Sequence, residues 1–467
     1  FNIKVKGIIM KKSILVVVIL LSIIAILPIT GNTFITKQIN ERLVELESLG
    51  LKVSKDESES SYLHSSRHFE FLLKDSKEFI EYLKQYSNEQ IPPYVKAMLD
   101  GVLVGADVEY SNLPFAKAFE IEIYPMKLSA KMSDTLQQDN VSLYEYIEKF
   151  LAQKGVLYHI EYNLLNSDFK GYLKDVDETY TLDDTTELTL SLEEAKFKGN
   201  GALLAPNELV SKIKKLHFNA TQKENNLNFH MNDFKSTSNF ESANTYITNI
   251  DIDETLLELK GDGRDVDISM DSLRVNASSN DQGTTTQINS KSSIKDLKLA
   301  TKEATVNLED FNFDIAINGL DKQEHTKFME LVSQNDVFMT PESNQALSAS
   351  ATSLLSKGLE IEVADFSIKK FAYNVDKKIK GFKVQTVLKV KEDLGLAKKM
   401  QISPLMALPN IGLESELRIS KEMYTKVLKR NGLTAGLAGF EKEDGDDYLF
   451  IVKFADTKLS INGKSLN

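Results

Sequence analysis

Apolar and polar residues alternate with a period of two over much of this chain, and no other sequence feature constrains the fold as strongly. Phe119, Ile121 and Ile123 alternate with more polar neighbours, and residues 188–192 and 227–231 repeat the pattern. Successive side chains of a strand point to opposite faces, so each segment predicts a strand with one buried and one solvated face. Such strands are typical of antiparallel sheets. We therefore expect an α+β protein, mostly β, with one long curved antiparallel sheet.

One strand pattern occurs three times, in residues 229–234, 306–313 and 361–368, with a looser copy in residues 266–275. In the three closer copies, two alternating apolar residues are followed by Asp-Phe, and the apolar positions then shift by one residue. A β-bulge produces such a shift while keeping the side chains on one face. Alternatively, each Asp begins a turn and ends its strand. The candidate residues for an apolar groove or core are Phe229, Met231, Phe234, Phe311, Phe313 and Phe366.

Helical patterns are fewer and are expected mainly in the C-terminal third. Residues 71–86, 321–337 and 342–357 have helical patterns, and Ser420 is expected to cap a helix over residues 421–430. We divide the chain into four parts. These are residues 1–9, interpreted as upstream of a natural start at Met10, a membrane anchor over 10–36, a β-rich region over 37–320, and a mixed region over 321–467 that continues the sheet.

The segment before residue 37 sets the expected location. Between Ser13 and Thr36 there are 24 residues without a charge, enough for a helix across a hydrocarbon core of about 30 Å. Lys11 and Lys12 precede it, so the positive-inside rule predicts a cytoplasmic N-terminus and a translocated body. A cleaved signal peptide, with a poor cleavage site, and a buried soluble helix are the alternatives. The anchor residues are Ile14, Leu15, Val16, Val17, Val18, Ile19, Leu20, Leu21, Ile23, Ile24, Ile26 and Leu27.

Charge and cysteine content exclude several classes of function. The chain has 56 Lys and Arg against 68 Asp and Glu, a net charge of −12, and without the four lysines that precede the apolar run the remainder carries −16. An acidic body argues against nucleic-acid binding. The absence of cysteine excludes disulfides, thiolate nucleophiles, iron–sulfur clusters and cysteine zinc sites. We expect a single-pass protein of the bacterial inner membrane with its body in the periplasm of a Gram-negative cell.

No motif in the sequence supports an enzyme, and neither a catalytic residue, a cofactor nor a metal is expected. His64 and His68 have the i, i+4 spacing of helical metal ligands, but they lack the Glu of H-E-x-x-H, and we interpret their role as structural or incidental. Acidic runs at residues 251–254, 262–267 and 441–447 lack the calcium-loop pattern and are interpreted as solvated turns. Phosphate-binding glycine loops and the G-x-S-x-G motif are absent.

Several segments, in their order and spacing, resemble the YdgA-like family of inner-membrane-anchored periplasmic proteins, which is catalogued as a domain of unknown function. The matching segments are residues 10–13, the apolar segment, residues 36–39, the helix after residues 319–321, and residues 355–361, 416–423 and 459–464. The resemblance implies an anchored periplasmic domain and supplies no catalytic residue. The strand pattern is also similar, more weakly, to AsmA-type proteins, whose long sheets form lipid-conducting grooves.

Three functions remain open from the sequence. The first is a non-enzymatic scaffold or binding surface in cell-envelope biogenesis; the second is transfer of lipid or another hydrophobic ligand along an AsmA-like groove; the third is a periplasmic hydrolase. The partners expected are the inner membrane and either lipids or envelope proteins, without nucleic acid, and the oligomeric state is open. Helices over the apolar face would favour a scaffold, whereas an open trough lined by the six candidate residues would favour lipid transfer.

Overall fold

The computed structural model describes residues 47, 50–60, 64–84, 98–111, 119–163, 165–183, 185–202, 205–242, 245–261, 264–334, 341–374, 377–430, 432–434 and 436–466. The expected upstream residues 1–9 and the expected anchor over 10–36 lie outside these residues. Within the described part, no helix combines the length and the apolar character needed to cross a membrane. The chain forms two compact units, Phe1–Ala243 with Glu258–Gly263 (unit 1) and Asn244–Leu257 with Arg264–Asn467 (unit 2).

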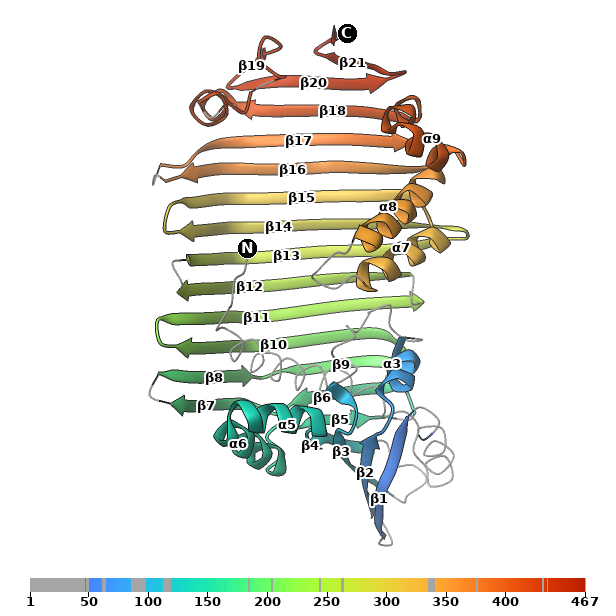
Figure 1. Ribbon diagram of the computed structural model, residues 1–467, viewed down its shortest axis with the longest axis vertical. Helices are drawn as coiled ribbons and strands as arrows, with labels where there is room; N and C mark the ends of the chain where they lie inside the picture. Colours follow the sequence, from blue (N-terminus) through green and yellow to red (C-terminus); the bar gives the residue numbers. More distant parts are fainter. Residues whose placement is uncertain are drawn as a thin grey trace. The chain divides into compact units, whose positions relative to one another are not determined.

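Unit 1 is built mainly of antiparallel strands (Figure 1). They pair in the order β1–β2–β3–β4–β5–β6–β9–β10–β11, and β8 pairs with both β7 and the second half of β10. The strands are β1 Leu51–Ser60, β2 His64–Leu73, β3 Leu103–Ser111, β4 Phe119–Lys127, β5 Tyr158–Tyr162, β6 Asp168–Leu173, β7 Val176–Asp183, β8 Thr186–Glu193, β9 Lys196–Ala202, β10 Ala205–Gln222 and β11 Asn225–Ser242. The helices are α3 Ser76–Lys84, α5 Ala130–Asp139 and α6 Val141–Ala152.

The main core of unit 1 packs these helices against one face of β2–β5. Val108, Ile121 and Ile160 are direct neighbours across β3, β4 and β5, and each is at most 2% exposed. Met132 and Leu136 from α5 and Leu151 from α6 belong to the same cluster. Because apolar positions alternate along each strand, the opposite face of these strands carries the polar residues described below.

Helices α5 and α6 lie within the region over 37–320 that is predicted to be β-rich, after the alternation that begins at Phe119 ends at Lys127. Ser129 and Asn140 cap the two helices, accepting hydrogen bonds from the amides of Met132 at 3.2 Å and Leu143 at 2.8 Å. The prediction that helices lie mainly in the C-terminal third is therefore confirmed only in part. The helix predicted over residues 71–86 begins at Ser76, since Phe71 to Leu73 still belong to β2.

Unit 2 contains an antiparallel sheet in which neighbours in sequence pair in the order β13–β14–β15–β16–β17–β18–β20–β21–β22, with β19 beside β20. The strands are β13 Arg264–Gln282, β14 Thr285–Thr301, β15 Thr305–Asp321, β16 Leu359–Tyr373, β17 Ile379–Val390, β18 Ile411–Ser420, β19 Lys442–Asp444, β20 Asp447–Ala455, β21 Lys458–Ile461 and β22 Lys464–Leu466. Strand β12, Thr245–Gly261, begins in unit 2 and ends in unit 1.

The helices of unit 2 lie near the ends of its strands. Figure 1 shows α7, Lys322–Gln334, and α8, Pro341–Ser356, at the end where β15 finishes, and α9, Leu396–Ile402, beside the end of β17. The remaining helices are the 3₁₀ helix η2 Pro404–Asn410, α10 Lys421–Met423 and the π-helix η3 Tyr424–Lys429. The helices predicted over 321–337, 342–357 and 421–430 are confirmed with small changes in their bounds.

The three Asp-Phe sites lie inside strands, so the alternative that each Asp begins a turn is wrong. At Asp365 the bulge is confirmed, because β16 has one residue more than β17 between Val363 and Phe366. Asp233 and Asp310 differ: the register is the same before and after them, and each has a left-handed φ of 51°. Asp tolerates this conformation better than most residues. Ser272, in the looser copy, also has a φ of 51°.

Candidate functional site

Three of the six candidate residues come together in unit 2 as a cluster of aromatic rings. Phe313 and Phe366 are direct partners on β15 and β16, with ring centroids 5.9 Å apart and perpendicular planes. The ring of Phe366 also contacts those of Phe311 at 6.0 Å and Phe382 at 5.2 Å. Edge-to-face contacts of this kind are favourable aromatic geometry. Phe382, on β17, did not emerge from the sequence as a candidate, since it belongs to no Asp-Phe copy.

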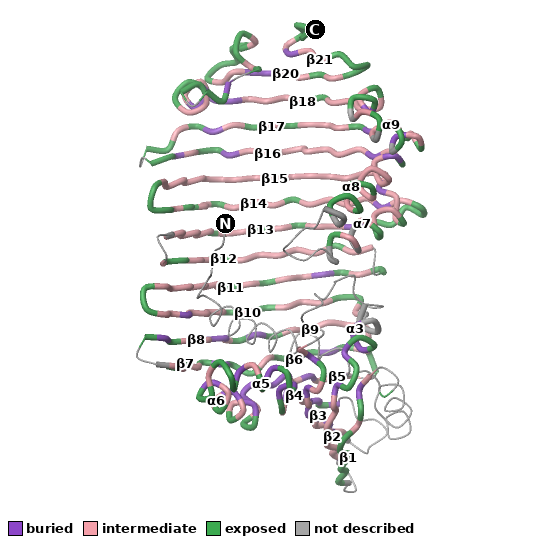
Figure 2. Tube along the Cα trace, viewed as in Figure 1, coloured by how far each residue is buried: buried purple, intermediate pink, exposed green. Residues whose placement is uncertain are grey.

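The rings belong to an apolar row that crosses six strands of unit 2, which we call the mid-strand stripe. Its members are Leu273, Ile294, Phe311, Phe313, Phe366, Ile368, Phe382, Val384 and Leu417, and each is the cross-strand partner of another member. Ile368 is buried, and the other eight are partly buried. Figure 2 shows the same intermediate burial along most of β13–β17. These side chains cover one another without forming a closed core.

A left-handed residue beside the stripe marks the shift in the apolar pattern of β15. On β14 and β15 the apolar pairs Leu297–Leu308 and Ile294–Phe311 are three residues apart instead of two. The residue between them that breaks the alternation on β15 is Asp310, with its left-handed φ. Three-residue spacing would place the two pairs on opposite faces of a regular strand. The local change at Asp310 therefore accounts for the phase shift seen in the sequence.

The other face of the same strands is charged and ion-paired. Lys291 lies 2.9 Å from Asp314, Lys370 lies 2.6 Å from Glu309, and Lys389 lies 2.7 Å from Glu360. Lysines of these pairs are roughly half to two-thirds exposed, so the pairs contribute little stability but mark this face as solvated. The sheet of unit 2 is therefore amphipathic.

Helices cover the apolar face only toward its margins. One cluster joins Leu354 and Leu355 of α8 to Leu320, Leu359 and Val390 at the strand ends near α9. A second cluster joins Met423 and Tyr424 to the last strands, and reaches Phe382 and Leu417. In the part of the chain that the structure describes, Phe311, Phe313 and Phe366 belong to neither cluster. The helices of these two clusters therefore do not pack on Phe311, Phe313 and Phe366, whose described contacts are with other members of the stripe.

The other three candidates lie in unit 1, on β11. Phe229, Met231 and Phe234 are paired with Phe218, Leu216 and Ile213 of β10, and all three are partly buried. Leu216 and Ile213 pack against a small cluster around Val176 and Leu192. The structure therefore distributes the six candidates over both units, three in each.

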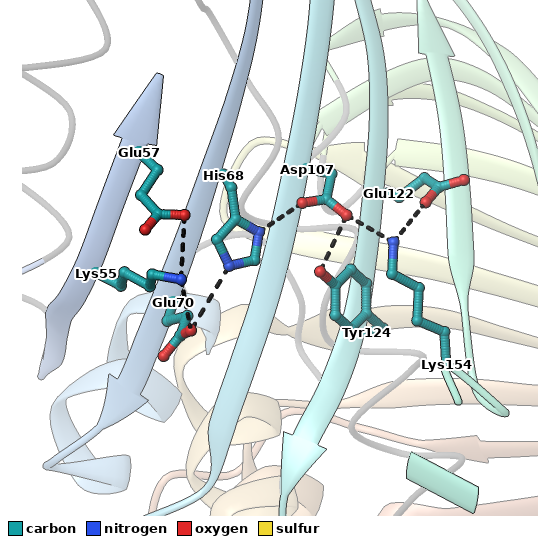
Figure 3. Close-up of polar contacts among 8 residues, drawn as sticks. All are labelled: Lys55, Glu57, His68, Glu70, Asp107, Glu122, Tyr124 and Lys154. Carbon is teal, nitrogen blue, oxygen red and sulfur yellow. Dashed lines mark hydrogen bonds and ion pairs between the residues drawn. The ribbon is translucent and has the colours of Figure 1, made fainter. Parts of the chain in front are cut away.

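Unit 1 contains a polar cluster that the sequence did not reveal, on the face of β1–β4 opposite the core (Figure 3). Glu57, His68, Asp107 and Glu122 are successive cross-strand partners. Asp107 accepts hydrogen bonds from His68 Nδ1 at 2.6 Å, the Tyr124 hydroxyl at 2.9 Å and Lys154 Nζ at 2.6 Å. We call these residues, with Lys154 and Tyr124, the polar ladder.

Lys154 closes the ladder from the turn after α6, where its φ is 50°. Its ammonium also donates to Glu122 at 3.0 Å and lies 4.2 Å from the centre of the Tyr124 ring. The ring itself lies over Gly105, where a Cβ atom would come within 2.5 Å of it. Only glycine therefore leaves room for Tyr124 to reach Asp107.

Three groups of the ladder, Asp107, Tyr124 and Lys154, have pKa values that keep them in fixed protonation states. Burial raises the pKa of Asp107, but hydrogen bonds from Lys154, His68 and Tyr124 outweigh it, and the pKa lies below its ordinary value. Burial and the bond to Asp107 raise the pKa of Tyr124 to about 12. Burial lowers the pKa of Lys154, yet its bonds to Asp107 and Glu122 leave it above the ordinary value. A general acid or base works best with a pKa near the working pH, so these shifts favour a structural role.

The structure shows where two histidines and one of the acidic runs lie. His64 and His68 lie on β2 and not on a helix, and the described side chain of His68 binds Asp107. Residues 251–254 lie within β12, so they are not a turn. Within the described residues, no group of three or more His, Asp or Glu side chains could hold a metal ion.

No protein-family model, curated protein or solved structure matches this chain. The resemblance to the YdgA-like family and the weaker likeness to AsmA-type proteins therefore stay predictions from the sequence.

Proposed function

We propose that this chain is a non-enzymatic protein of the bacterial cell envelope, anchored in the inner membrane, whose β-sheet serves as a binding surface in the periplasm. Of the occupants considered, acyl chains of lipids fit the mid-strand stripe best, which favours hydrophobic-ligand transfer over a scaffold. The observation that carries this choice is the stripe itself: a continuous apolar row, partly buried and outside both described clusters at Phe311, Phe313 and Phe366.

The dimensions of the stripe suit an acyl chain. Strands lie about 4.8 Å apart, so a row across six strands extends about 24 Å. One leaflet contributes about half of a 30 Å hydrocarbon core, and an acyl chain is therefore shorter than the row. Apolar patches of this kind on a protein surface mark sites for ligands, membranes or protein partners. The charged opposite face, with Lys291 paired to Asp314, has no such character.

The test is mass spectrometry of lipids that copurify with the full chain in detergent. We expect phospholipid in a constant ratio to protein, and less of it in the double variant Phe313→Ser/Phe366→Ser. Each partly buried ring contributes on the order of 1 kcal/mol of apolar contact. The double variant removes two rings and about 2 kcal/mol, so about a 30-fold weaker interaction is expected. Tyr373→Ser is the matched control, because Tyr373 is an aromatic residue of the same strand β16, beyond the stripe and 49% exposed.

Two results would contradict acyl-chain binding. One is wild-type protein without lipid in a mild detergent, and the other is equal lipid loss in the double variant and in Tyr373→Ser. Either result would favour a protein-binding scaffold over lipid transfer. Circular dichroism of each variant checks that the sheet is intact, so that lipid loss is not mistaken for unfolding.

A further inference from the structure

A short segment of unit 2 exposes large apolar side chains on the outside of the molecule. Leu394 is 68% exposed, Ile402 is 77% exposed and Leu405 is 70% exposed, and Met406 beside it is 42% exposed. They lie in α9, in η2 and in the turn before α9, which we call the 394–406 segment. An isolated exposed leucine is ordinary on a protein surface, but a group of four within thirteen residues needs an explanation.

The segment is held firmly, so its exposure is not that of a loose loop. Leu396, Met400 and Ala407 point inward and pack in the cluster with α8. Asp393 accepts hydrogen bonds from Lys399 at 2.5 Å and Asn410 at 2.7 Å, joining the start of α9 to the end of η2. With one apolar side packed inward, the outward side would be expected to be polar. It instead exposes Ile402, Leu405 and Met406, beside the charged Lys398.

The charge of the segment differs from that of the rest of the chain. From Leu394 to Leu413 there is no acidic residue, and Lys398 and Lys399 are the charged residues. Lys399 is paired with Asp393, whereas Lys398 is exposed. Before the segment, Lys391 and Glu392 are both exposed and offset one another in charge. The chain as a whole carries −12. A locally basic, apolar surface on an acidic protein is complementary to anionic phospholipid.

We propose that the 394–406 segment docks on a phospholipid bilayer, with Leu394, Ile402 and Leu405 entering the interface. Interfacial segments place their apolar side about 5–10 Å into the boundary between headgroups and acyl chains. The stem of Lys398 can lie along this boundary while its ammonium binds headgroup phosphates. This contact goes beyond the proposed function, because it gives the folded body a membrane contact separate from the expected anchor and from the mid-strand stripe.

The chain has no tryptophan, so a single introduced tryptophan reports on its own position. We would reconstitute full-length L405W into vesicles of phosphatidylethanolamine and phosphatidylglycerol with brominated acyl chains, which quench tryptophan on contact. The matched control is L433W, since Leu433 is 64% exposed in unit 2 but outside the segment. We expect quenching of L405W at least about twofold stronger than that of L433W, because only the former reaches acyl depth. Lys398→Glu in the L405W protein should weaken the quenching.

Equal quenching of L405W and L433W would overturn the proposal. A second result would also overturn it: L405W fluorescence is not quenched, and the protein is a dimer by analytical ultracentrifugation in detergent. If Ile402→Ser then dissociates this dimer, the exposed residues form a contact between two copies of the chain. Lipid copurification in detergent, where no bilayer is present, reports on the stripe alone. Failure of this proposal and failure of the proposed function can therefore be told apart.

Discussion

Asp107 is the residue on which the polar ladder of unit 1 depends, because its one carboxylate joins three strands and the turn after α6. It takes hydrogen bonds from His68, Tyr124 and Lys154, which come from β2, β4 and that turn. Removing its charge leaves the partly exposed ammonium of Lys154 with the carboxylate of Glu122 as its described ion pair. A partly buried charged group that loses its partner destabilises the fold by more than the original hydrogen bond contributed.

We therefore expect Asp107→Asn to lower the free energy of unfolding by about 1–3 kcal/mol at pH 7. The pH dependence has a definite sign. The pKa of Asp107 is lowered in the folded protein, so its contribution is present above the unfolded pKa of about 3.9 and is lost as the pH falls through the folded value. Urea unfolding should show a large difference in the free energy of unfolding between the wild type and Asp107→Asn at neutral pH. Below pH 4 this difference should be smaller.

Asp177→Asn is the matched control, since Asp177 is an exposed carboxylate on β7 of the same unit. It should unfold like the wild type at both pH values. If the loss in free energy of unfolding caused by Asp107→Asn does not change with pH, the charge of the carboxylate is not what stabilises the ladder.

At the scale of single elements, the unusual feature is a strand that contains a left-handed residue. Ser272 has a φ of 51° in the interior of β13, and the register is the same on both sides of it. Glycine adopts this conformation at no steric cost, whereas a β-branched residue is strained in it. Ser269, three residues earlier, does not have a positive φ.

Opposite effects follow for the two serines. Ser272→Gly should raise the free energy of unfolding by about 0.5–1 kcal/mol and Ser272→Val should lower it by about 1–2 kcal/mol. Ser269→Gly should instead destabilise by about 0.5–1 kcal/mol, since glycine weakens a regular strand. Thermal and urea unfolding of the three variants and the wild type measure these changes. If glycine acts in the same direction at both positions, the left-handed conformation of Ser272 is not what limits stability there.

How far the sequence predicts each element depends on whether its pattern is local. The alternation around Phe229 and Phe313 predicts β11 and β15, because side-chain period alone distinguishes strand from helix. Helices α5 and α6 also have a local signal, because Ser129 and Asn140 are good caps followed by apolar residues at helical spacing, yet they lie in the region predicted to be β-rich. The phase shift at Asp310 is visible in the sequence. The pattern alone does not show whether a left-handed residue or a bulge causes it.

At the scale of the whole molecule, the sites depend on pairings that no local pattern contains. His68 and Asp107 are 39 residues apart, and Lys154 is 47 residues beyond Asp107. The sequence pattern tells which face of a strand is polar but not which strand lies beside it or in what register. The aromatic cluster is easier to predict from the sequence, since Phe311 and Phe366 occupy equivalent places in two copies of one pattern. Phe382 has no such pattern, and it became visible only through its pairing with Ile368.

The charge distribution of the whole chain makes a prediction about topology. The lysines before residue 13 and the acidic remainder predict a cytoplasmic N-terminus and a translocated body. The chain has no cysteine, so single cysteines can report the side on which each part lies. We expect a membrane-impermeant maleimide to label Glu224→Cys, in the exposed turn between β10 and β11, in intact spheroplasts. Lys11→Cys, which leaves Lys12 in place, should be labelled only after lysis. Labelling of Lys11→Cys alone would place the body in the cytoplasm, and recovery of unlabelled protein in the soluble fraction would exclude the anchor.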